Sequence, residues 1–180
     1  MDAVRLPLGK DFVYGRLRSL REEDVDGMLS WMHDSETARH FARDFGSMTE
    51  GKAAAFVRAS WCDAQDVHLA VTDEREVYLG TVSLKDVDFV ADTAEYAIAV
   101  TVEARGTGAA LAGTRDILSL AFDGLGLREV WLCVKESNVR AQRFYARVGF
   151  SLRECCSDDA GLRYFGMSKD EYGEARRAWG

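Results

Sequence analysis

In the first hundred residues, apolar positions recur at about every second residue in some stretches and every third or fourth in others. The first period is typical of a strand and the second of a helix that buries one face. Thr49 can cap a helix through its side chain, and the short polar stretch 72–76 predicts a hairpin between two strands. The expected strands cover residues 15–20, 67–71, 77–84 and 92–100, and the expected helices cover 24–32 and about 50–61.

After residue 100 the rhythm changes to strands and helices in alternation. A strand ends near Val102, a glycine-containing loop follows, and an amphipathic helix begins at about Gly108. Residues 129–134 predict a buried strand, and a helix after it is expected to stop at Gly149 in the left-handed conformation. Two last strands, about 150–156 and 162–168, are expected to form a hairpin. The outline predicts a mixed α/β fold whose central, mostly antiparallel sheet is flanked by helices.

The composition fits one domain covering residues 1–180. Of the 180 residues, 47% are apolar, which suffices for one sizeable core. The longest apolar runs, 53–57 and 96–100, are far shorter than the ~20 residues that cross a bilayer. The first twelve residues lack the apolar stretch of a secretory signal. We therefore expect a cytoplasmic protein.

The four cysteines show no pattern of metal ligands. They form no C-x-x-C pair and have no histidine at zinc-like spacing, so no metal is expected. Cys133 lies in an apolar strand-like run and is expected in the core. Cys155 and Cys156 are adjacent, outside any redox motif.

Charge is distributed unevenly along the chain. The net charge is −7, yet residues 105–153 carry eight Lys and Arg against four Asp and Glu. The acidic total argues against nucleic acid or an anionic membrane as a partner. The basic block suits one compact polyanion, and the acidic remainder favours a cationic partner such as an amine.

The strongest chemical signal is a loop of small residues between a strand and a helix. Backbone N–H groups of such a loop, together with the helix start, suit a pyrophosphate. A P-loop would need a lysine directly after Gly113, where Thr114 stands, and a dinucleotide fold would need a small residue in place of Leu111. An ordinary glycine turn entering a helix is the remaining alternative. The loop consists of Arg105, Gly106, Thr107, Gly108, Ala109 and Ala110.

Two motifs at the expected separation resemble the GCN5-related N-acetyltransferase (GNAT) superfamily. The first has the form [QR]-x-x-G-x-[GA] before a long helix, and the second has the form N-x-x-A-x-x-x-Y-x-x-x-G-F. The opening LRSLREEDVDGMLSWMHDSE is similar to the ribosomal-protein and spermidine acetyltransferase branch. The matching positions are Arg105, Gly108 and Ala110 in the first motif and Asn138, Ala141, Tyr145, Gly149 and Phe150 in the second.

The resemblance implies a binding site for acetyl-coenzyme A. Amides of loop 105–110 would hold the pyrophosphate. The strand ending at Ile98–Val102 would pair with the pantetheine arm where the sheet splays, and an N–H near Ile98 or Val100 would polarise the thioester carbonyl. Asn138 would start its helix and touch the pantetheine. Two further basic residues, Arg140 and Arg143, would neutralise the adenosine phosphates or else be exposed helix charges.

Two residues are candidates for proton transfer. Tyr145 can donate a proton to the departing thiolate, because a phenol with pKa ~10 matches a thiolate in basicity. Alternatively, Tyr145 completes an apolar stripe with Phe144 and Val148. Glu95 can take the proton of the amine through water. Its alternative is a cross-strand charge pair or a solvated side chain.

Three histidines and two tryptophans complete the candidates. His68 alternates with apolar neighbours and is expected to face solvent. His33 and His40 flank the elements expected to line the acceptor side. Trp31 and Trp61 are expected to be core anchors.

Three functions remain open from the sequence. The first is an N-acetyltransferase that transfers the acetyl group directly to a small-molecule or peptide amine, since no cysteine lies in a nucleophile motif. The second is an inactive module that binds or senses acyl-coenzyme A, and the third is a nucleotide-binding protein of another class. The sequence also leaves open whether two copies form a homodimer.

Overall fold

The computed structural model describes residues 4–41, 44–154 and 161–179. The elements are two-residue β1 (Val13–Tyr14), β2 (Leu17–Ser19), the 3-10 turn η1 (Glu22–Asp24), α1 (Val25–Met32), α2 (Ser35–Ala38), α3 (Glu50–Ser60), β3 (Val67–Thr72), β4 (Tyr78–Asp88), β5 (Thr93–Val100), α4 (Ala109–Ser119), the π-helical turn η2 (Leu120–Gly124), β6 (Glu129–Lys135), α5 (Val139–Val148), β7 (Ser151–Arg153), β8 (Leu162–Ser168) and α6 (Lys169–Ala178).

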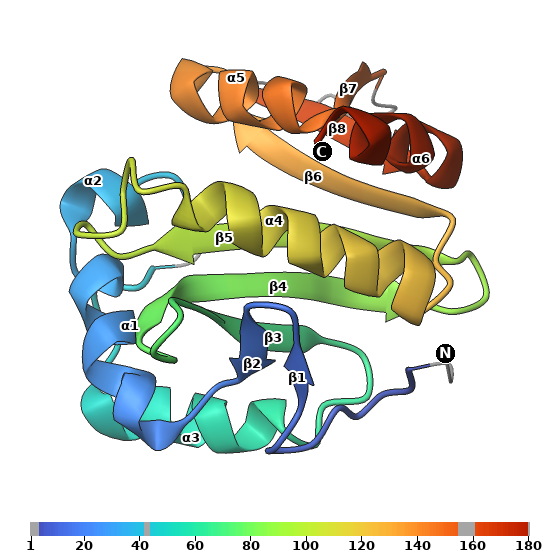
Figure 1. The fold of residues 1–180 in the computed structure, drawn as a ribbon. Coiled ribbons are helices and arrows are strands. Elements are labelled where there is room, and N and C mark those ends of the chain that lie inside the picture. The colour runs from blue at the N-terminus through green and yellow to red at the C-terminus, as the bar shows by residue number, and fades with distance from the viewer. Residues whose placement is uncertain (1–3, 42–43, 155–160, 180) are drawn as a thin grey trace.

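The eight strands form one open sheet in the order β1-β2-β3-β4-β5-β6-β8-β7. All neighbouring strands are antiparallel except β5 and β6, which are parallel. This pair is joined only at residues 93–95 and 129–131. Beyond that point the two strands diverge toward the end of the sheet where α4 begins (Figure 1). The expected mixed α/β fold and the expected splay are both present.

Helices cover both faces of the sheet, and each face has its own buried cluster. The larger cluster lies beneath α4, α5 and α6, and the smaller one lies beneath α1 and α3. On the first face, a Cβ atom added to Gly113 would lie 2.6 Å from Val71, so the missing side chain lets α4 approach β3 closely. Helix α4, which follows the glycine loop, therefore lies on the opposite face of the sheet from α1 and α3.

Three expected helix signals are confirmed by local hydrogen bonds and backbone angles. Thr49 accepts a hydrogen bond from the amide of Lys52, and Asn138 accepts one from the amide of Ala141 at 3.1 Å. Gly149 ends α5 with φ of +118°. These signals depend on neighbouring residues and so were readable from the sequence.

Several expectations differ from the structure. Strand β2 is shorter than the expected stretch 15–20 and pairs with β1 in a hairpin. The helices α2 and α6 were not expected. Cys133 is exposed, because β6 buries only one face and this side chain points away from it. The last hairpin is confirmed as β7 and β8, whereas Cys155 and Cys156 lie outside the described residues.

A buried ion pair ties β2 to the start of α1. The guanidinium of Arg18 donates to both carboxylate oxygens of Asp24 at 2.7 and 2.8 Å. Their side chains are only 5% and 2% exposed. Losing one partner would leave the other charge buried and unpaired, which is a costly state.

Within the described residues, no helix is both long enough and apolar enough to cross a membrane.

Candidate active site

The glycine loop adopts a conformation that requires glycine at two positions. Gly106 has φ of +77°, and Gly108, the residue that precedes α4, has φ of +90°. Side chains rarely adopt such angles. A Cβ atom at either glycine would meet nothing within 4 Å. The space outside these two residues is therefore open for a ligand to approach the backbone.

Along the loop, amides that donate a hydrogen bond to a nearby acceptor alternate with amides that have no partner among the described residues. The amides of Gly106, Gly108 and Ala110 make no hydrogen bond with any described residue. They lie at the start of α4, where the helix dipole adds a partial positive charge, so together they form a suitable cradle for an anion. Local acceptors take the other three: Arg105 donates to the Val102 carbonyl at 3.2 Å, Thr107 to the Ala104 carbonyl at 3.3 Å, and Ala109 to the Thr107 hydroxyl at 3.3 Å.

The side chain of Arg105 joins the glycine loop to α2. Its guanidinium contacts Asp34, which caps α2, and Thr37 within α2. Hydrogen bonds from Thr37 and from Arg105 lower the pKa of Asp34. The pair fastens the loop to α2, so the positive charge of Arg105 is largely balanced before any anion binds.

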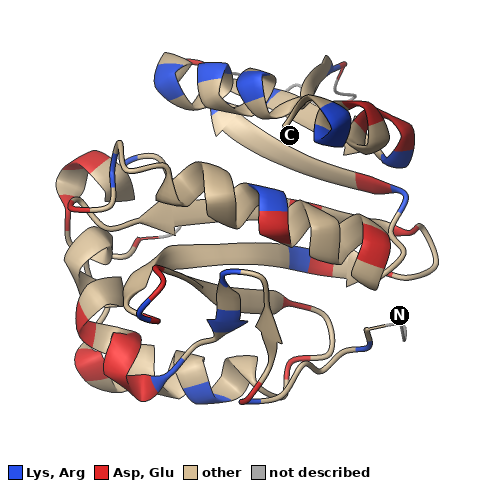
Figure 2. Cartoon of the chain, viewed as in Figure 1, with Lys and Arg blue, Asp and Glu red and all other residues tan. Residues whose placement is uncertain are grey.

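Other basic side chains lie near this end of the molecule. Arg140 and Arg143 are exposed on α5, and within the described part of the chain neither makes an ion pair. Figure 2 shows basic residues along α5, whereas acidic residues gather around α1 and α2. The two arginines therefore remain available to a phosphate.

The edge of β5 that β6 leaves is the second part of the site. Thr101 donates its N–H to Leu79 at 2.9 Å, toward β4. Because N–H groups alternate between the two edges of a strand, those of Ile98 and Val100 point toward the splay. Val102 follows the strand and is 47% exposed. The strand thus presents unpaired backbone groups beside the glycine loop.

Tyr145 packs beside the same splay. Its ring lies 5.6 Å from that of Phe144, so it does belong to the apolar stripe, and 5.9 Å from that of Tyr96 on β5. Burial, and to a smaller extent the neighbouring Cys133 thiol, raises the pKa of Tyr145 to about 12. The phenol therefore carries its proton at neutral pH.

Glu95 forms the cross-strand charge pair considered for it. Its carboxylate lies 2.9 Å from the ammonium group of Lys85, the residue opposite it on β4. Glu95 itself does not line the cavity described next, although Lys85 does.

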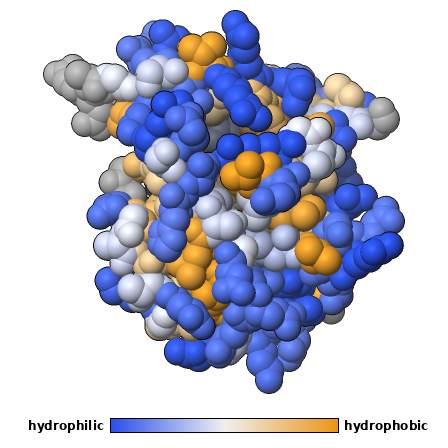
Figure 3. Space-filling view, turned by 90° about the vertical axis from the view of Figure 1, so that its left-hand side faces the viewer, coloured by the Kyte–Doolittle hydropathy of each residue, from blue (hydrophilic) through white to orange (hydrophobic). Residues whose placement is uncertain are grey.

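A cavity of about 250 Å³ lies on the sheet face covered by α1 and α3. Its sheet wall comes from β3, β4 and β5, and includes Ala97, Ile98 and Ala99. Its other walls come from α1, α3 and the segment before α3. Figure 3 views the end of the molecule that carries the start of α4, where apolar surface lies among hydrophilic residues. This cavity adjoins the strand whose open edge faces the splay.

His68 lines this cavity, and the expectation that it faces solvent was wrong. Helix α3 covers that face of the sheet, and the ring of Phe56 lies 4.8 Å from that of His68. Its Nδ1 atom lies 2.7 Å from the hydroxyl of Ser83, and its Nε2 atom lies 3.6 Å from the carboxylate of Asp66.

Burial lowers the pKa of His68 below its usual 6.5. The carboxylates of Asp66 and Asp63 act in the opposite direction, and Lys85 adds to the lowering. The imidazole is therefore neutral at pH 7 and able to accept a proton. Of the other two histidines, neither His33 nor His40 is among the residues that line the cavity, although His33 contacts the carbonyl of the lining residue Met48 at 2.9 Å.

Comparison with known proteins places this arrangement in a family. A family model described as an acetyltransferase (GNAT) domain matches residues 16–151. The chain belongs to the GNAT acetyltransferase family. The expected likeness to the spermidine acetyltransferase branch is also confirmed. Spermidine N(1)-acetyltransferase of Escherichia coli K12 is 28% identical over 144 residues, which cover 76% of this chain and 73% of that protein.

Two further GNAT comparisons differ in what they cover. An uncharacterised N-acetyltransferase of Mycobacterium tuberculosis H37Rv is 53% identical over 47 residues, 26% of this chain, so the match spans only 30% of that relative. The solved structure of Vibrio cholerae spermidine N-acetyltransferase in complex with CoA and spermine has a TM-score of 0.77 at 18% identity. It covers 87% of this chain and 96% of that one. At this identity the likeness establishes the fold.

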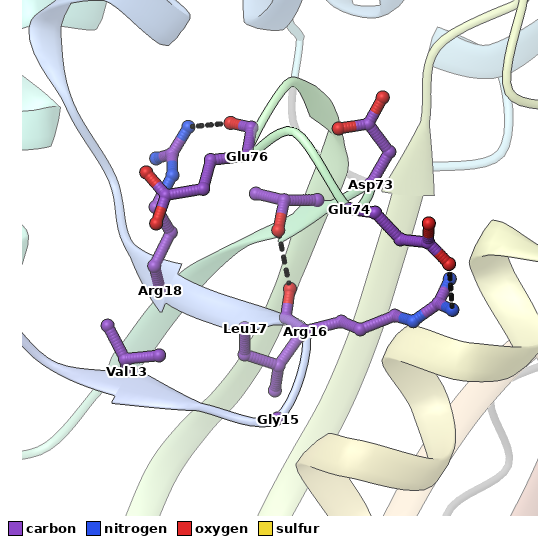
Figure 4. A pocket seen from close by; sticks show the side chains of 9 residues that line it. Val13, Gly15, Arg16, Leu17, Arg18, Asp73, Glu74 and Glu76 are labelled. Carbon is purple, nitrogen blue, oxygen red and sulfur yellow. Dashed lines mark hydrogen bonds and ion pairs between the residues drawn. The ribbon is translucent and has the colours of Figure 1, made fainter.

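The GNAT domain contains a second cavity, of about 230 Å³, on the other side of β4 from the splay. It is formed by β1, β2 and the β3–β4 turn, and it includes no residue of β5, α4 or α5. Its charged groups have partners, including an ion pair between Arg16 and Glu74 at 3.8 Å and a hydrogen bond from Arg18 to the Glu76 carbonyl at 3.1 Å (Figure 4). The first cavity is therefore the candidate site. Among the described residues, no cluster of His, Cys, Asp or Glu is suited to a metal ion.

Proposed function

We propose that this chain is an N-acetyltransferase that moves the acetyl group of acetyl-coenzyme A directly onto a primary amine. One observation carries the proposal: three groups of atoms meet at β5. The three unpaired amides at the start of α4 lie beside the open edge of β5. Residues of the same strand form a wall of the 250 Å³ cavity. The cradle suits a diphosphate, the open edge suits a pantetheine amide chain, and the cavity suits an amine.

Different groups of the chain bind different parts of acetyl-coenzyme A. The amides of Gly106, Gly108 and Ala110 bind the diphosphate. Arg140 and Arg143, which project from α5, bind the phosphates of the adenosine moiety. The side chain of Asn138, whose oxygen caps α5, retains its amide N–H groups for the pantetheine.

The backbone of β5 prepares the thioester for attack. An N–H of Ile98 or Val100 donates to the thioester carbonyl oxygen and stabilises the negative charge that develops there. No side chain has to be charged for this step, because the donor is part of the open strand edge.

The reaction needs one proton acceptor and one proton donor. The amine nitrogen bonds to the carbonyl carbon, the carbon–sulfur bond breaks, and the thiolate takes the phenolic proton of Tyr145. The proton of the amine goes to His68 through the hydroxyl of Ser83, which lies between the imidazole and β5. We prefer His68 to Glu95 as the base because it lines the cavity and is neutral, whereas Glu95 is held by Lys85.

The test is thiol release from acetyl-coenzyme A, measured against a panel of primary amines. The proposal predicts stoichiometric acetylated amine and free coenzyme A with at least one amine class. Binding of acetyl-coenzyme A without thiol release for any amine would instead support the inactive binding module. Tight binding of ATP or NAD that coenzyme A does not displace would support a nucleotide-binding protein of another class.

A further inference from the structure

We propose that the acceptor is a primary amine with one amino group and one aromatic or large apolar substituent, and is not a polyamine. This inference rests on the acetyltransferase activity proposed above. It concerns the cavity on the α1 and α3 face, which we call the acceptor cavity.

The walls of the acceptor cavity are aromatic and aliphatic. Trp31, Phe41 and Phe45 form a cluster with ring centroids 5.2–5.7 Å apart. The indole N–H of Trp31 donates to the hydroxyl of Tyr78 at 2.9 Å, so its polar group is already satisfied. These rings offer faces and edges to an apolar ligand, and the pairing geometry favours an additional aromatic ring. Three methionines, whose thioethers adapt to varied shapes, complete this part of the wall: Met28, Met32 and Met48.

The charge of the acceptor cavity is unsuited to a polycation. Its lining includes no Asp or Glu among the described residues. Two nearby carboxylates already have cationic partners, since Glu95 pairs with Lys85 and Asp34 pairs with Arg105. A third, Asp66, lies 3.6 Å from the imidazole of the lining residue His68 and accepts a hydrogen bond from the amide of Asp86. Each additional ammonium group buried there would lose its hydration without gaining a carboxylate partner among the described lining residues, which is unfavourable. A molecule with a single amino group avoids this penalty once that group gives up its proton.

The volume of the acceptor cavity fits a compact apolar group. A dry apolar cavity of ~150 Å³ is sufficient for benzene, and this cavity has about 250 Å³. One ring with a short chain therefore fits. Because Ala97 and Ile98 belong to both the cavity wall and β5, such a chain can direct the amino group toward the splayed edge.

The experiment compares kcat/KM for four amines at saturating acetyl-coenzyme A: phenethylamine, a short peptide with an N-terminal phenylalanine, methylamine and spermidine. We expect phenethylamine or the peptide to exceed spermidine by about 100-fold or more. Both molecules have one amino group and one aromatic ring. Faster turnover of phenethylamine would identify the acceptor as a free amine, and faster turnover of the peptide would identify it as a peptide N-terminus.

A cavity-filling variant links that preference to the acceptor cavity. Ala97→Leu places a larger side chain in the cavity and should lower the ratio of kcat/KM for the preferred aromatic amine to kcat/KM for methylamine by about tenfold or more. Ala91→Leu, in the exposed β4–β5 turn, is the matched control and should behave as the unchanged protein. Thermal melting and acetyl-coenzyme A affinity report whether each variant is folded.

The outcomes are distinguishable. A preference for spermidine, or an aromatic preference that survives in folded Ala97→Leu, would overturn the inference and leave the acetyltransferase proposal standing. Binding of acetyl-coenzyme A without turnover of any amine would overturn both.

Discussion

Replacing Gly108 by aspartate tests the anion cradle at its centre. The residue precedes the first turn of α4, its amide is unpaired within the described structure, and a Cβ atom there meets open space. An aspartate at this position would place a carboxylate where we expect the diphosphate. Asparagine has nearly the same shape without the charge, and both residues tolerate left-handed backbone angles better than other side chains do. The comparison of Gly108→Asp with Gly108→Asn therefore isolates the electrostatic effect.

The magnitude follows from Coulomb's law. Two unit charges 4 Å apart interact with about 1 kcal/mol in water and about 4 kcal/mol at an effective dielectric of 20. A carboxylate on this exposed loop lies between those limits, so we expect it to weaken binding by about 1.4–2.7 kcal/mol more than asparagine does. This difference corresponds to a Kd about 10 to 100 times higher.

Isothermal titration with acetyl-coenzyme A measures the difference, and salt supplies an internal check. Raising the ionic strength should narrow the gap between the two variants, because exposed charges are screened. Both variants should melt below the unchanged protein by a similar amount, since either side chain is strained at the φ of +90° that Gly108 adopts. Equal affinities for Gly108→Asp and Gly108→Asn at low salt would refute the location of the diphosphate.

Three other predictions concern proton transfer and stability. Tyr145→Phe should lower kcat about 100-fold or more while acetyl-coenzyme A binding stays within about twofold by titration; unchanged turnover would remove this residue from the mechanism. If neutral His68 is the base, kcat/KM should fall as pH drops below the lowered pKa of His68, which gives the profile an acidic limb. Asp66→Asn removes a charge that raises this pKa and should therefore move the acidic limb to lower pH. The same amine serves both pH profiles, so its own titration cancels, and a limb that stays in place or moves upward would contradict the assignment. Asp24→Ala should reduce the free energy of unfolding in urea by about 3–5 kcal/mol, because its buried arginine partner loses its counter-ion. Glu22→Gln, in an exposed ion pair, should cost less than about 1 kcal/mol; equal losses in the two variants would argue against burial as the cause.

The parts of the fold that depend on neighbouring residues were predictable. The left-handed stop at Gly149 and the cap at Asn138 act within one or two turns of chain, and each has the expected conformation or hydrogen bond. Helix α6, which was not expected, begins with a similar local signal. Ser168 and Glu171 form a capping box, with hydrogen bonds of 3.2 and 2.7 Å between side chain and amide in the two directions.

The acceptor side depended on packing between distant segments, which local patterns do not specify. The alternation along β3 correctly placed His68 opposite its apolar neighbours, yet it could not show that α3 covers the face on which His68 lies. The pairing of Arg105 with Asp34 likewise joins residues 71 positions apart. For Cys133, the sequence did contain the answer, since buried and outward residues alternate along β6 and the strand buries one face only.

The most direct test of the central claim is the response of backbone amides to acetyl-coenzyme A, followed by NMR of the isotopically labelled protein. The account predicts the largest shifts at Gly106, Gly108 and Ala110, with further shifts at Ile98 and Val100 on the open edge of β5. Saturable binding that leaves these five amides unchanged and moves signals in another part of the chain would contradict it.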